Sequence, residues 1–424
     1  MNVQATAETS SRHARNWVPL LDEPAYKPRR IRIVCVGAGY SGLMLAYEAK
    51  YNKSLQGFID LTIYEKNREV GGTWLVNRYP GVACDVPAHI YTFPFEPNPD
   101  WSAFYASGPE IWAYIKRTAD KYGLAEHVQF QSKVTQATWD ELLGKWSVKI
   151  WHDSEEKRDE CDILIDGSGF LNNWHWPDIP GLDDFKGEMV HTADWNPSIN
   201  VAGKRVAVIG NGSSGVQVLP HLQKTAAHLT TYVRTPTWIF ANYASELTKD
   251  GTNFTFTEEE KKEFRDNPAS LWRFRKEIEN RPVAALDAQK AALEKAYHRM
   301  RERLGDDQDL CDKLIPKYEY GCRRPTTGDG YLEALRQGNA CVTFDPIVKI
   351  TEFGIETTQG HTDFDIIVCA TGFDASFRPS WTLQGRNGHR LQDMWEDSPE
   401  AYFGIAAANM PNYFIFIGPN SPGK

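Results

Sequence analysis

Two short glycine-rich stretches decide the fold: Gly37-Ala38-Gly39-Tyr40-Ser41-Gly42 and Gly210-Asn211-Gly212-Ser213-Ser214-Gly215. Each follows an apolar run typical of a strand, at 31–36 and 206–209, and precedes an apolar run typical of a helix. Glycines in this pattern let the chain turn tightly, so that a pyrophosphate can approach the amide groups and the positive dipole end of the helix. Two such turns predict two dinucleotide sites and electron transfer between the bound groups.

The residues that follow the two turns differ in charge. Glu65 ends a second strand-like run, 59–65, and lies 23 residues after Gly42. A carboxylate at this place accepts hydrogen bonds from a ribose diol. Arg234 follows the run 229–233 after the second turn, where its guanidinium suits a 2′-phosphate. The second site is therefore predicted to bind NADP rather than NAD.

Composition restricts the class of protein. The chain has 424 residues, a length that is enough for two or three domains. Of these residues 41% are hydrophobic, which can supply a core. The net charge of −9 argues against nucleic acid or an anionic membrane as a partner. The sequence shows no run of 18 apolar residues and no secretory-type opening, so we expect a cytoplasmic protein without a membrane span. The seven cysteines form no Cys-x-x-Cys pair, which favours buried, reduced thiols and no metal site.

Hydrophobic periodicity predicts an α/β fold with two doubly wound dinucleotide-binding units. Strands are expected at 128–138, 145–151, 163–166, 205–209, 341–350 and 364–370, and a helix at 110–124. Thr257 and Glu260 have the spacing of a capping box, and helical periodicity runs with breaks from there to about 310, which we interpret as a helical insertion. The Gly/Pro/aromatic-rich stretch 71–108 is long for a connection, so we expect it to be functional.

The stretch that begins at Gly71-Gly72-Thr73-Trp74 and ends at Cys84-Asp85 resembles the flavin site of FAD- and NADPH-dependent Baeyer–Villiger monooxygenases. The similarity extends along most of the chain. Between the two glycine turns lies Phe185-x-Gly187-x-x-x-His191-x-x-x-Trp195, which is similar to the fingerprint of that family. Asn196 departs from the fingerprint, which ends in Pro or Asp. The connecting position of His191 favours a structural or gating role over acid–base chemistry.

The resemblance implies FAD and NADPH as cofactors and assigns residues to each. The residues that it assigns to FAD are Gly37, Gly39, Tyr40, Ser41, Gly42, Glu65, Lys66, Gly72, Thr73, Trp74, Arg78, Cys84, Asp85, Val86, Tyr91 and Val134. The residues that it assigns to NADP are Gly210, Asn211, Gly212, Ser213, Ser214, Gly215, Gln217, Arg234, Thr235 and Arg323. It also implies domain limits: an N-terminal arm at 1–29, an FAD-binding domain at 30–180 and 373–424, and an NADP-binding domain at 181–372 that carries the helical insertion.

Arg324 and Asp85 are the catalytic residues that the resemblance implies. A permanently charged guanidinium stabilises the negative charge that develops when reduced flavin reacts with O₂, and Asp85 would pair with it. The implied reaction is insertion of one oxygen atom beside a ketone carbonyl, which gives an ester or lactone. The stretch Cys322-Arg323-Arg324-Pro325 and the following Gly328-x-Gly330-Tyr331 are most similar to fungal members that serve polyketide-like secondary metabolism.

Other functions stay open at the level of sequence. Oxygenation of a heteroatom and hydroxylation both need a neutral hydroperoxide as the oxidant. The positive charge of Arg324 disfavours that neutral form. A flavin disulfide reductase needs a cysteine partner for Cys84, and the sequence offers none nearby. The chain stops at Gly418-Pro419-Asn420-Ser421-Pro422-Gly423-Lys424, where members of the family continue with a helix that closes the FAD domain. A truncated, uncoupled or inactive flavoprotein is therefore a further alternative, and the oligomeric state is not predicted.

Overall fold

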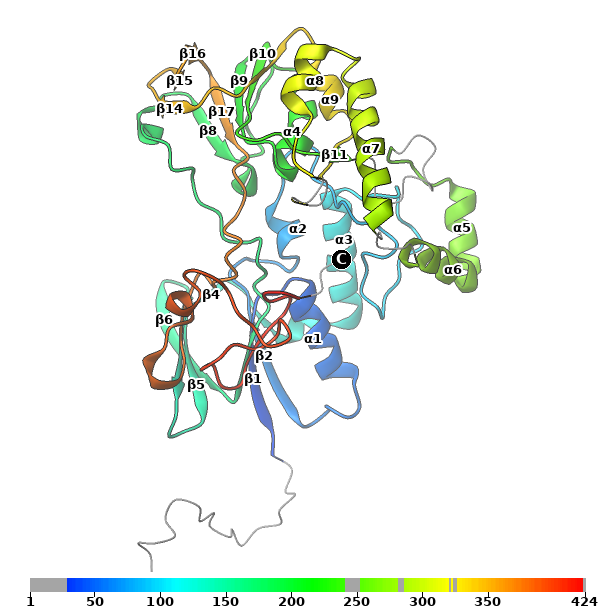
Figure 1. Cartoon of the computed structure of the whole chain (residues 1–424). Coiled ribbons are helices and arrows are strands. Elements are labelled where there is room, and N and C mark those ends of the chain that lie inside the picture. The colour runs from blue at the N-terminus through cyan, green and yellow to red at the C-terminus, as the bar shows by residue number, and fades with distance from the viewer. Residues whose placement is uncertain (1–28, 241–251, 281–285, 320–321, 323–325, 422–424) are drawn as a thin grey trace, which may run out of the picture.

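The computed structural model describes residues 29–240, 252–280, 286–319, 322 and 326–421. Within that part of the chain, a lower α/β body contains the start and the end of the chain, and an upper body contains its middle (Figure 1). Extended segments run between the bodies. Most of the expected N-terminal arm, residues 1–28, lies outside the described residues.

A parallel sheet with the order β19-β7-β1-β2-β3 forms the lower body. Its strands are β1 (Ile31–Val36), β2 (Ile59–Tyr64), β3 (Val128–Gln129), β7 (Ile163–Asp166) and β19 (Tyr413–Ile415). Strand β1 lies in the middle, and Val34 and Cys35 are fully buried because the sheet is covered on both faces. Strand β19, which comes last in the sequence, therefore returns the chain to the sheet that contains β1.

A second parallel sheet with the order β13-β10-β9-β17-β8 forms the upper body. Its strands are β8 (Glu188–His191), β9 (Arg205–Ile209), β10 (His228–Tyr232), β13 (Ala340–Thr343) and β17 (Ile366–Cys369). All of them lie between β7 and β19 in sequence, so this sheet is nested within the chain of the first. The expected fold class, two parallel nucleotide-binding sheets with the second inserted in the first, is confirmed.

Smaller sheets and the helices complete the two bodies. The smaller sheets comprise β18 (Thr382–Gln384) with β4 (Ser132–Asp140), β5 (Lys145–His152) and β6 (Glu155–Cys161), then β14 (Ile347–Ile350), β15 (Gly354–Thr357) and β16 (Gly360–Asp363), and the pair β11 (Ile239–Phe240) and β12 (Thr326–Thr327). The helices are α1 (Tyr40–Tyr51), α2 (Thr73–Val76), α3 (Gly108–Tyr122), α4 (Ser213–Gln223), α5 (Glu258–Asp266), α6 (Pro268–Glu279), α7 (Leu286–Arg303), α8 (Gln308–Leu314), α9 (Tyr331–Leu335) and α10 (Leu391–Met394). Short 3₁₀ helices lie at Leu124–His127, Leu182–Asp184, Thr192–Asp194 and Arg386–Gly388.

Several expected elements have different limits, each for a local reason. Helix α3 ends at Tyr122 because Gly123 takes a left-handed conformation, φ 60°, that caps the helix. The strand expected over 341–350 is divided between β13 and β14, with Pro346 in the gap. Strand β6 was not expected, because its sequence is mostly charged and has no apolar alternation. It pairs with β5 along a mostly exposed sheet edge, where charged side chains stay solvated.

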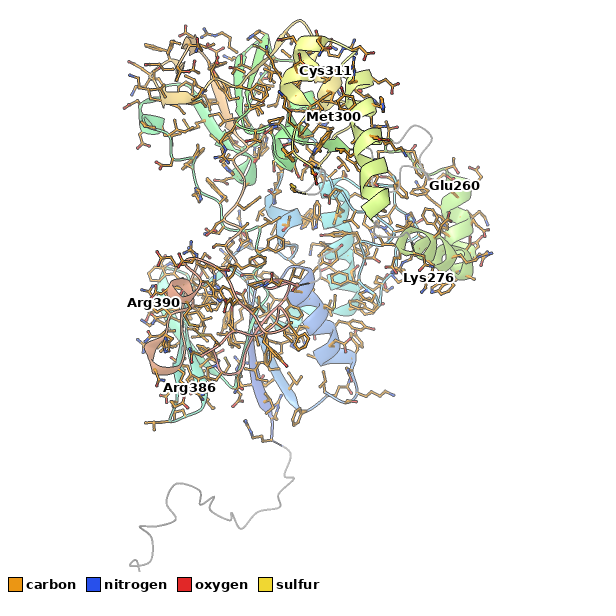
Figure 2. The ribbon with its side chains drawn as sticks, in the orientation of Figure 1. Glu260, Lys276, Met300, Cys311, Arg386 and Arg390 are labelled. Atoms are coloured by element: carbon orange, nitrogen blue, oxygen red, sulfur yellow. The ribbon has the colours of Figure 1, made fainter. Side chains whose placement is uncertain are left out.

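The expected helical insertion consists of parts that pack differently. The buried residues Met300 and Cys311, from α7 and α8, belong to the hydrophobic core that also contains the upper sheet and α4. Helices α5 and α6, which carry Glu260 and Lys276, lie at the side of the molecule (Figure 2). The capping box is present as predicted, with Thr257 accepting from the Glu260 amide and the Glu260 side chain accepting from the Thr257 amide.

An aromatic cage joins α5 and α6 to the loop of the lower body. The His89 ring is 1% exposed and lies edge-on to Phe256, Phe264 and Phe274, with ring centroids 4.8, 5.2 and 5.2 Å away. Neither ring nitrogen has a hydrogen-bond partner among the described residues. Burial, together with the charge of Arg275, lowers the pKa of His89 to about 4. The cage therefore holds a neutral imidazole.

Tyr413 makes a buried hydrogen bond that closes the first sheet, and its loss is the first prediction. Its hydroxyl donates to Asp166 Oδ2 over 3.0 Å, and burial raises the pKa of Asp166. Tyr413→Phe leaves a buried acceptor short of a donor, so we expect the free energy of unfolding to fall by about 1–3 kcal/mol. Denaturant titration followed by Trp fluorescence measures the loss. Tyr402→Phe is the matched control, because Tyr402 is 72% exposed, and it should leave the free energy of unfolding unchanged.

His89→Phe is expected to reduce the acid sensitivity of the fold. The folded-state pKa, about 4, lies below the ordinary value of 6.5, so the unfolded chain binds more protons between these pH values. The stability that neutral His89 contributes is thus lost as pH falls through this window, at up to about 1.4 kcal/mol per pH unit. Phenylalanine is aromatic like the rings around it and does not titrate. Melting temperatures measured from pH 7 to 4.5 should fall less steeply in the variant, and an unchanged slope would contradict the prediction.

Candidate cofactor and active site

The first glycine turn brings backbone groups unusually close together. A Cβ on Gly42, in α1, would lie 2.1 Å from the carbonyl oxygen of Gly37. Gly37 itself has φ +100°, and a Cβ there would lie 2.7 Å from the carbonyl oxygen of Gly167, just after β7. Helix α1 begins after Gly39, and among the described residues no side chain caps it and no acidic residue occupies its first turn. The amides of this helix end are thus available to an anion.

The second turn repeats this geometry in the upper body. A Cβ on Gly215, in α4, would lie 2.2 Å from the carbonyl oxygen of Gly210. Gly210 has φ +104°, and a Cβ there would lie 2.5 Å from the carbonyl oxygen of Ala370, just after β17. Helix α4 begins after Gly212 and likewise has no side-chain cap or first-turn acid among the described residues. A Cβ on Gly212 would meet nothing within 4 Å, so space is open in front of this helix end.

The two residues expected to select the ribose groups lie beside these turns. Glu65 is the first residue after β2 and is 4% exposed. Its Oε2 accepts a hydrogen bond of 2.8 Å from the amide of Ala38, inside the first turn, and its Oε1 accepts from Asn67. Glu65 therefore braces the turn. Arg234 lies two residues after β10 and is exposed, and Thr235 follows it half-buried.

The Gly71-Gly72 stretch packs directly on the first turn. The Gly71 amide donates to the carbonyl oxygen of Ala38 over 3.1 Å, and a Cβ on Gly72 would lie 3.0 Å from the Cα of Gly39. An aromatic group follows: Tyr40 donates its hydroxyl to the Tyr91 carbonyl, and the Trp74 indole donates to the Tyr91 hydroxyl, each over 3.1 Å. Burial raises the pKa of both tyrosines, so both stay neutral.

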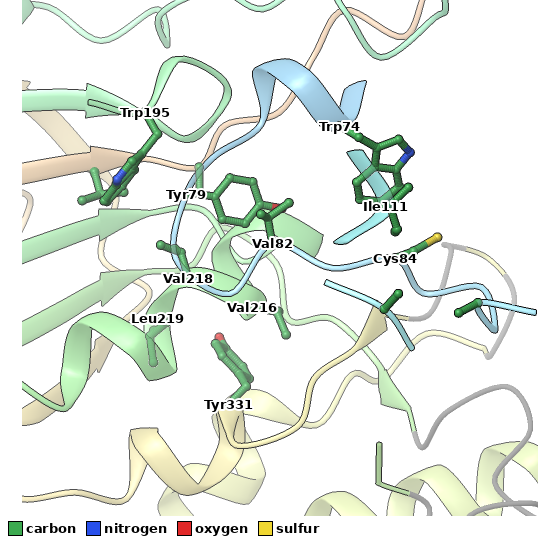
Figure 3. Close-up of a cluster of buried hydrophobic side chains, with 14 of the residues drawn as sticks. Trp74, Tyr79, Val82, Cys84, Ile111, Trp195, Val216, Val218, Leu219 and Tyr331 are labelled. Carbon is green, nitrogen blue, oxygen red and sulfur yellow. The ribbon is translucent and has the colours of Figure 1, made fainter. Parts of the chain in front are cut away.

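The loop that carries Asp85 is held by a side chain from the other body. Gln217, in α4, accepts a hydrogen bond of 2.7 Å from the Tyr79 hydroxyl and donates one of 3.0 Å to the carbonyl oxygen of Ala83. Figure 3 shows Tyr79 and Val82 of this loop beside Val216 and Val218 of α4. Asp85 is half-buried two residues beyond Ala83. The sequence pointed to Gln217 as a nucleotide contact and held no signal for this contact between the bodies.

The remaining predicted residues are spread around these two turns. Lys66 donates to Asn172, over 2.6 Å, and Arg78 donates to the Leu75 carbonyl, over 2.8 Å; both side chains are exposed. Val134 is buried in β4, in the core between the first sheet and the sheet of β4–β6. Of the others, Ser41 and Val86 are half-buried, Thr73 is exposed and Cys84 is buried. Asn211 lies just before the N-cap of α4, and Ser213 and Ser214 begin this helix.

Arg323 and Arg324 lie outside the described residues, and their predicted roles stay predictions. The described neighbours are Cys322, which is exposed, and Thr326, whose amide donates to the Trp238 carbonyl over 3.0 Å in the β11–β12 pair. All seven cysteines are in the described part of the chain, and none forms a disulfide. Cys322 and Cys341 are exposed, which differs from the expectation of buried thiols.

The fingerprint residue His191 ties together the segments that connect the bodies. Its ring stacks on Trp174 with centroids 4.6 Å apart, and its Nδ1 accepts from the Ala193 amide. The Nε2 atom lies 3.1 Å from Thr371 Oγ1, and with Nδ1 as an acceptor it is Nε2 that donates. Burial lowers the pKa of His191 to about 4, so the ring is neutral at physiological pH. This geometry supports a structural or gating role.

Known proteins are similar to this chain in sequence and in fold. Residues 30–259 match the family described as flavin-binding monooxygenase-like. The FAD-binding monooxygenase tazF of Aspergillus terreus is 50% identical over 415 residues, which are 96% of this chain and 74% of that protein. The FAD-binding monooxygenase moxY of Dothistroma septosporum is 39% identical over 413 residues, 93% of this chain and 64% of that protein. A Baeyer-Villiger monooxygenase of Pseudomonas aeruginosa is 34% identical over 402 residues, 93% of this chain and 73% of that protein.

The solved structures agree with the sequence comparison. A crystal structure of OTEMO in complex with FAD and NADP superposes with a TM-score of 0.79 at 28% identity, over 93% of this chain and 80% of that chain. Among the described residues, no helix is long and apolar enough to cross a membrane. The matching glycine turns, the fingerprint and these relatives lead to one conclusion: the chain belongs to the flavin-binding monooxygenase-like family and is an FAD monooxygenase of the Baeyer–Villiger type.

Proposed function

We propose that this chain uses NADPH and O₂ to insert one oxygen atom beside a ketone carbonyl, giving an ester or lactone. The observation that carries the proposal is the placement of the Asp85 loop. This loop follows the Gly71-Gly72 stretch on the first glycine turn, and Gln217 binds it to the helix of the second turn. The loop that carries Asp85 is thus bound to elements of both proposed nucleotide sites.

The residues of both turns fit their proposed groups. Each helix end offers amides without a competing side-chain cap among the described residues, as a pyrophosphate requires. We assign FAD to the unit formed by 30–180 and 373–424, and NADP to 181–372. Glu65 suits the FAD ribose and Arg234 the 2′-phosphate of NADP, and we propose that Arg323 also binds that phosphate. The free thiols favour a reducing compartment, and we propose the cytoplasm.

The protein side chains have distinct roles in this reaction. When bound, FAD would supply the site with a hydride acceptor for NADPH and with the capacity to activate O₂. Arg324 supplies a permanent positive charge that holds the developing oxyanion of the ketone adduct. Asp85 neutralises and orients that guanidinium. The aromatic group of Tyr40, Trp74 and Tyr91 excludes water beside the first turn, which strengthens these electrostatic interactions.

The similar proteins indicate the chemical class of the ketone. The fungal FAD-binding monooxygenases tazF and moxY cover more than nine-tenths of this chain. We propose a ketone of fungal polyketide-like secondary metabolism as the substrate.

Paired glycine substitutions distinguish the two proposed sites. Gly42→Ala forces a methyl group into the Gly37 carbonyl, so we expect the purified protein to lose its flavin absorbance. Gly215→Ala does the same against Gly210, and this variant should retain FAD while its reduction by NADPH slows. Absorbance at 450 nm and stopped-flow reduction check both results. Flavin loss in Gly215→Ala together with retention in Gly42→Ala would reverse the assignment.

Arg324→Ala tests the proposed chemistry. We expect ester formation to fall about 10²- to 10³-fold, the cost of removing one oxyanion-stabilising group, while NADPH still reduces the flavin. Product analysis by gas chromatography and stopped-flow absorbance separate the two steps. Arg386→Ala, at an exposed arginine paired with Glu141, is the matched control. Undiminished ester yield in Arg324→Ala would disprove the role of this arginine.

A further inference from the structure

The loop formed by residues 79–83 lies directly on helix α4 of the upper body. Gly81 has φ +85°, and a Cβ there would lie 2.4 Å from the ring of His221 and 2.6 Å from the carbonyl oxygen of Gln217. Both of these residues belong to α4. Contacts this close leave no free space between the loop and the helix, so a shift of one is transmitted to the other.

The side chain of Gln217 binds both ends of this loop. Its Oε1 accepts a hydrogen bond of 2.7 Å from the Tyr79 hydroxyl, and its Nε2 donates one of 3.0 Å to the carbonyl oxygen of Ala83. Tyr79 is 6% exposed, so water competes little for its hydroxyl. Burial raises the pKa of Tyr79, and a hydrogen bond from the Ser214 hydroxyl opposes that rise. The Tyr79 oxygen thus donates to one residue of α4 and accepts from another.

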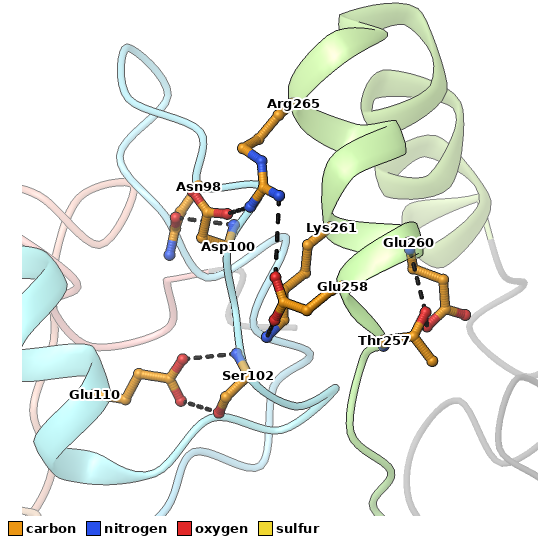
Figure 4. Close-up of polar contacts among 9 residues, drawn as sticks. All are labelled: Asn98, Asp100, Ser102, Glu110, Thr257, Glu258, Glu260, Lys261 and Arg265. Carbon is orange, nitrogen blue, oxygen red and sulfur yellow. Dashed lines mark hydrogen bonds and ion pairs between the residues drawn. The ribbon is translucent and has the colours of Figure 1, made fainter.

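The residues that follow the loop pair with a second segment, which is anchored elsewhere. The Cys84 amide donates to the carbonyl oxygen of Ala106 over 3.2 Å. In that second segment, the Glu110 carboxylate accepts from both the amide and the hydroxyl of Ser102, over 2.7 and 2.6 Å (Figure 4). Asp85 directly follows Cys84, so its position depends on this segment on one side and on α4 on the other.

The residues that hold Tyr79 belong to the helix end of the second glycine turn. Ser214 is the second residue of α4, and Gln217 lies three residues further along. Among the described residues no side chain caps this end, and a Cβ on Gly212 would meet nothing within 4 Å. The amides there are open to the pyrophosphate of NADP. The Ser214 hydroxyl has one proton, which it can donate to Tyr79 or to a phosphate oxygen but not to both.

We propose that Tyr79 is a positioning residue that couples NADP binding at the second turn to the position of the loop that carries Asp85. The inference rests on the proposed function, because it takes the second turn as the NADP site. Without nucleotide, Ser214 and Gln217 together hold Tyr79 on α4. A phosphate that takes the Ser214 proton leaves Gln217 alone, so the loop is held less tightly and the lost hydrogen bond opposes nucleotide binding. By linkage, a looser loop and tighter NADP binding go together.

Tyr79→Phe removes the hydroxyl and keeps the ring. The FAD-loaded variant should bind NADP⁺ about 2- to 10-fold more tightly, because the phosphate no longer competes for Ser214. A merely structural loss would weaken binding instead. Isothermal titration calorimetry with NADP⁺ measures the dissociation constants. Tyr51→Phe is the matched control: its hydroxyl also donates a hydrogen bond, to the Tyr122 carbonyl, but Tyr51 is 43% exposed and belongs to α1, so the dissociation constant should stay unchanged.

Ser214→Ala tests whether the effect passes through this hydroxyl. The change removes the group for which Tyr79 and the phosphate compete, so NADP⁺ should bind more weakly. Adding Tyr79→Phe to Ser214→Ala should give no tightening, since no hydroxyl is left to release. Tightening of equal size in both backgrounds would contradict the coupling through Ser214. Unchanged or weaker binding in Tyr79→Phe alone would overturn the proposal.

Amide hydrogen exchange reports on the loop without turnover. In the wild type, NADP⁺ should raise exchange at Val82 and Cys84, whose amides donate within and just after the loop. In Tyr79→Phe, exchange at these amides should be raised already, and NADP⁺ should add little. Exchange in the wild type that NADP⁺ leaves unchanged would reject the coupling.

The two proposals fail in different ways. Wild-type protein that makes ester but shows neither effect of Tyr79→Phe would reject the coupling and retain the proposed function. Both effects in a protein that makes no ester from any ketone of a panel would reject the proposed function and retain the coupling. A wild type that binds no NADP⁺ would reject both.

Discussion

Steric contact between a helix glycine and a turn carbonyl is the constraint on which this structure depends. In each body a side chain on the last glycine of the turn would lie little more than 2 Å from the carbonyl oxygen of the first. The strand and the helix can pack this closely only without a Cβ. The first glycine of each turn also abuts the carbonyl that follows the neighbouring strand, β7 or β17. The turn thereby fixes both the helix and the sheet around the place where a pyrophosphate would bind.

The contacts between the bodies are specific rather than merely apolar. Gln217 reaches from α4 to the loop after Tyr79, Asn253 reaches from the insertion to Tyr105, and His191 joins the connecting segments. Each is a polar side chain bound to a group of another segment, so its hydrogen bonds fix direction as well as distance. The buried core beneath Gln217 adds the hydrophobic contribution. This combination holds the Asp85 loop at the boundary of the two nucleotide-binding units.

Sequence patterns predicted the parallel strands well, because buried strands such as β1 and β9 are short, continuous apolar runs. Sequence patterns failed to predict elements whose residue types are not determined by burial. Strand β6 is a charged edge, and nothing in the sequence of the expected helical insertion indicated that Met300 of α7 and Cys311 of α8 would join the main core. Exposed Cys322 and Cys341 likewise follow from local position rather than from any pattern in the chain.

The sequence by itself determined the two turns, the acid and the arginine that follow them, and the membership of the chain in its family. These features are local, since spacing over a few residues decides the backbone geometry of a turn and the charge beside it. Only the tertiary structure decided which side chain holds the loop that carries Asp85. Gln217 lies 132 residues from Asp85 along the chain, and its hydrogen bonds with Tyr79 and Ala83 depend on how the two bodies pack. No periodicity or spacing in the sequence encodes a contact between residues so far apart, because only folding brings them together.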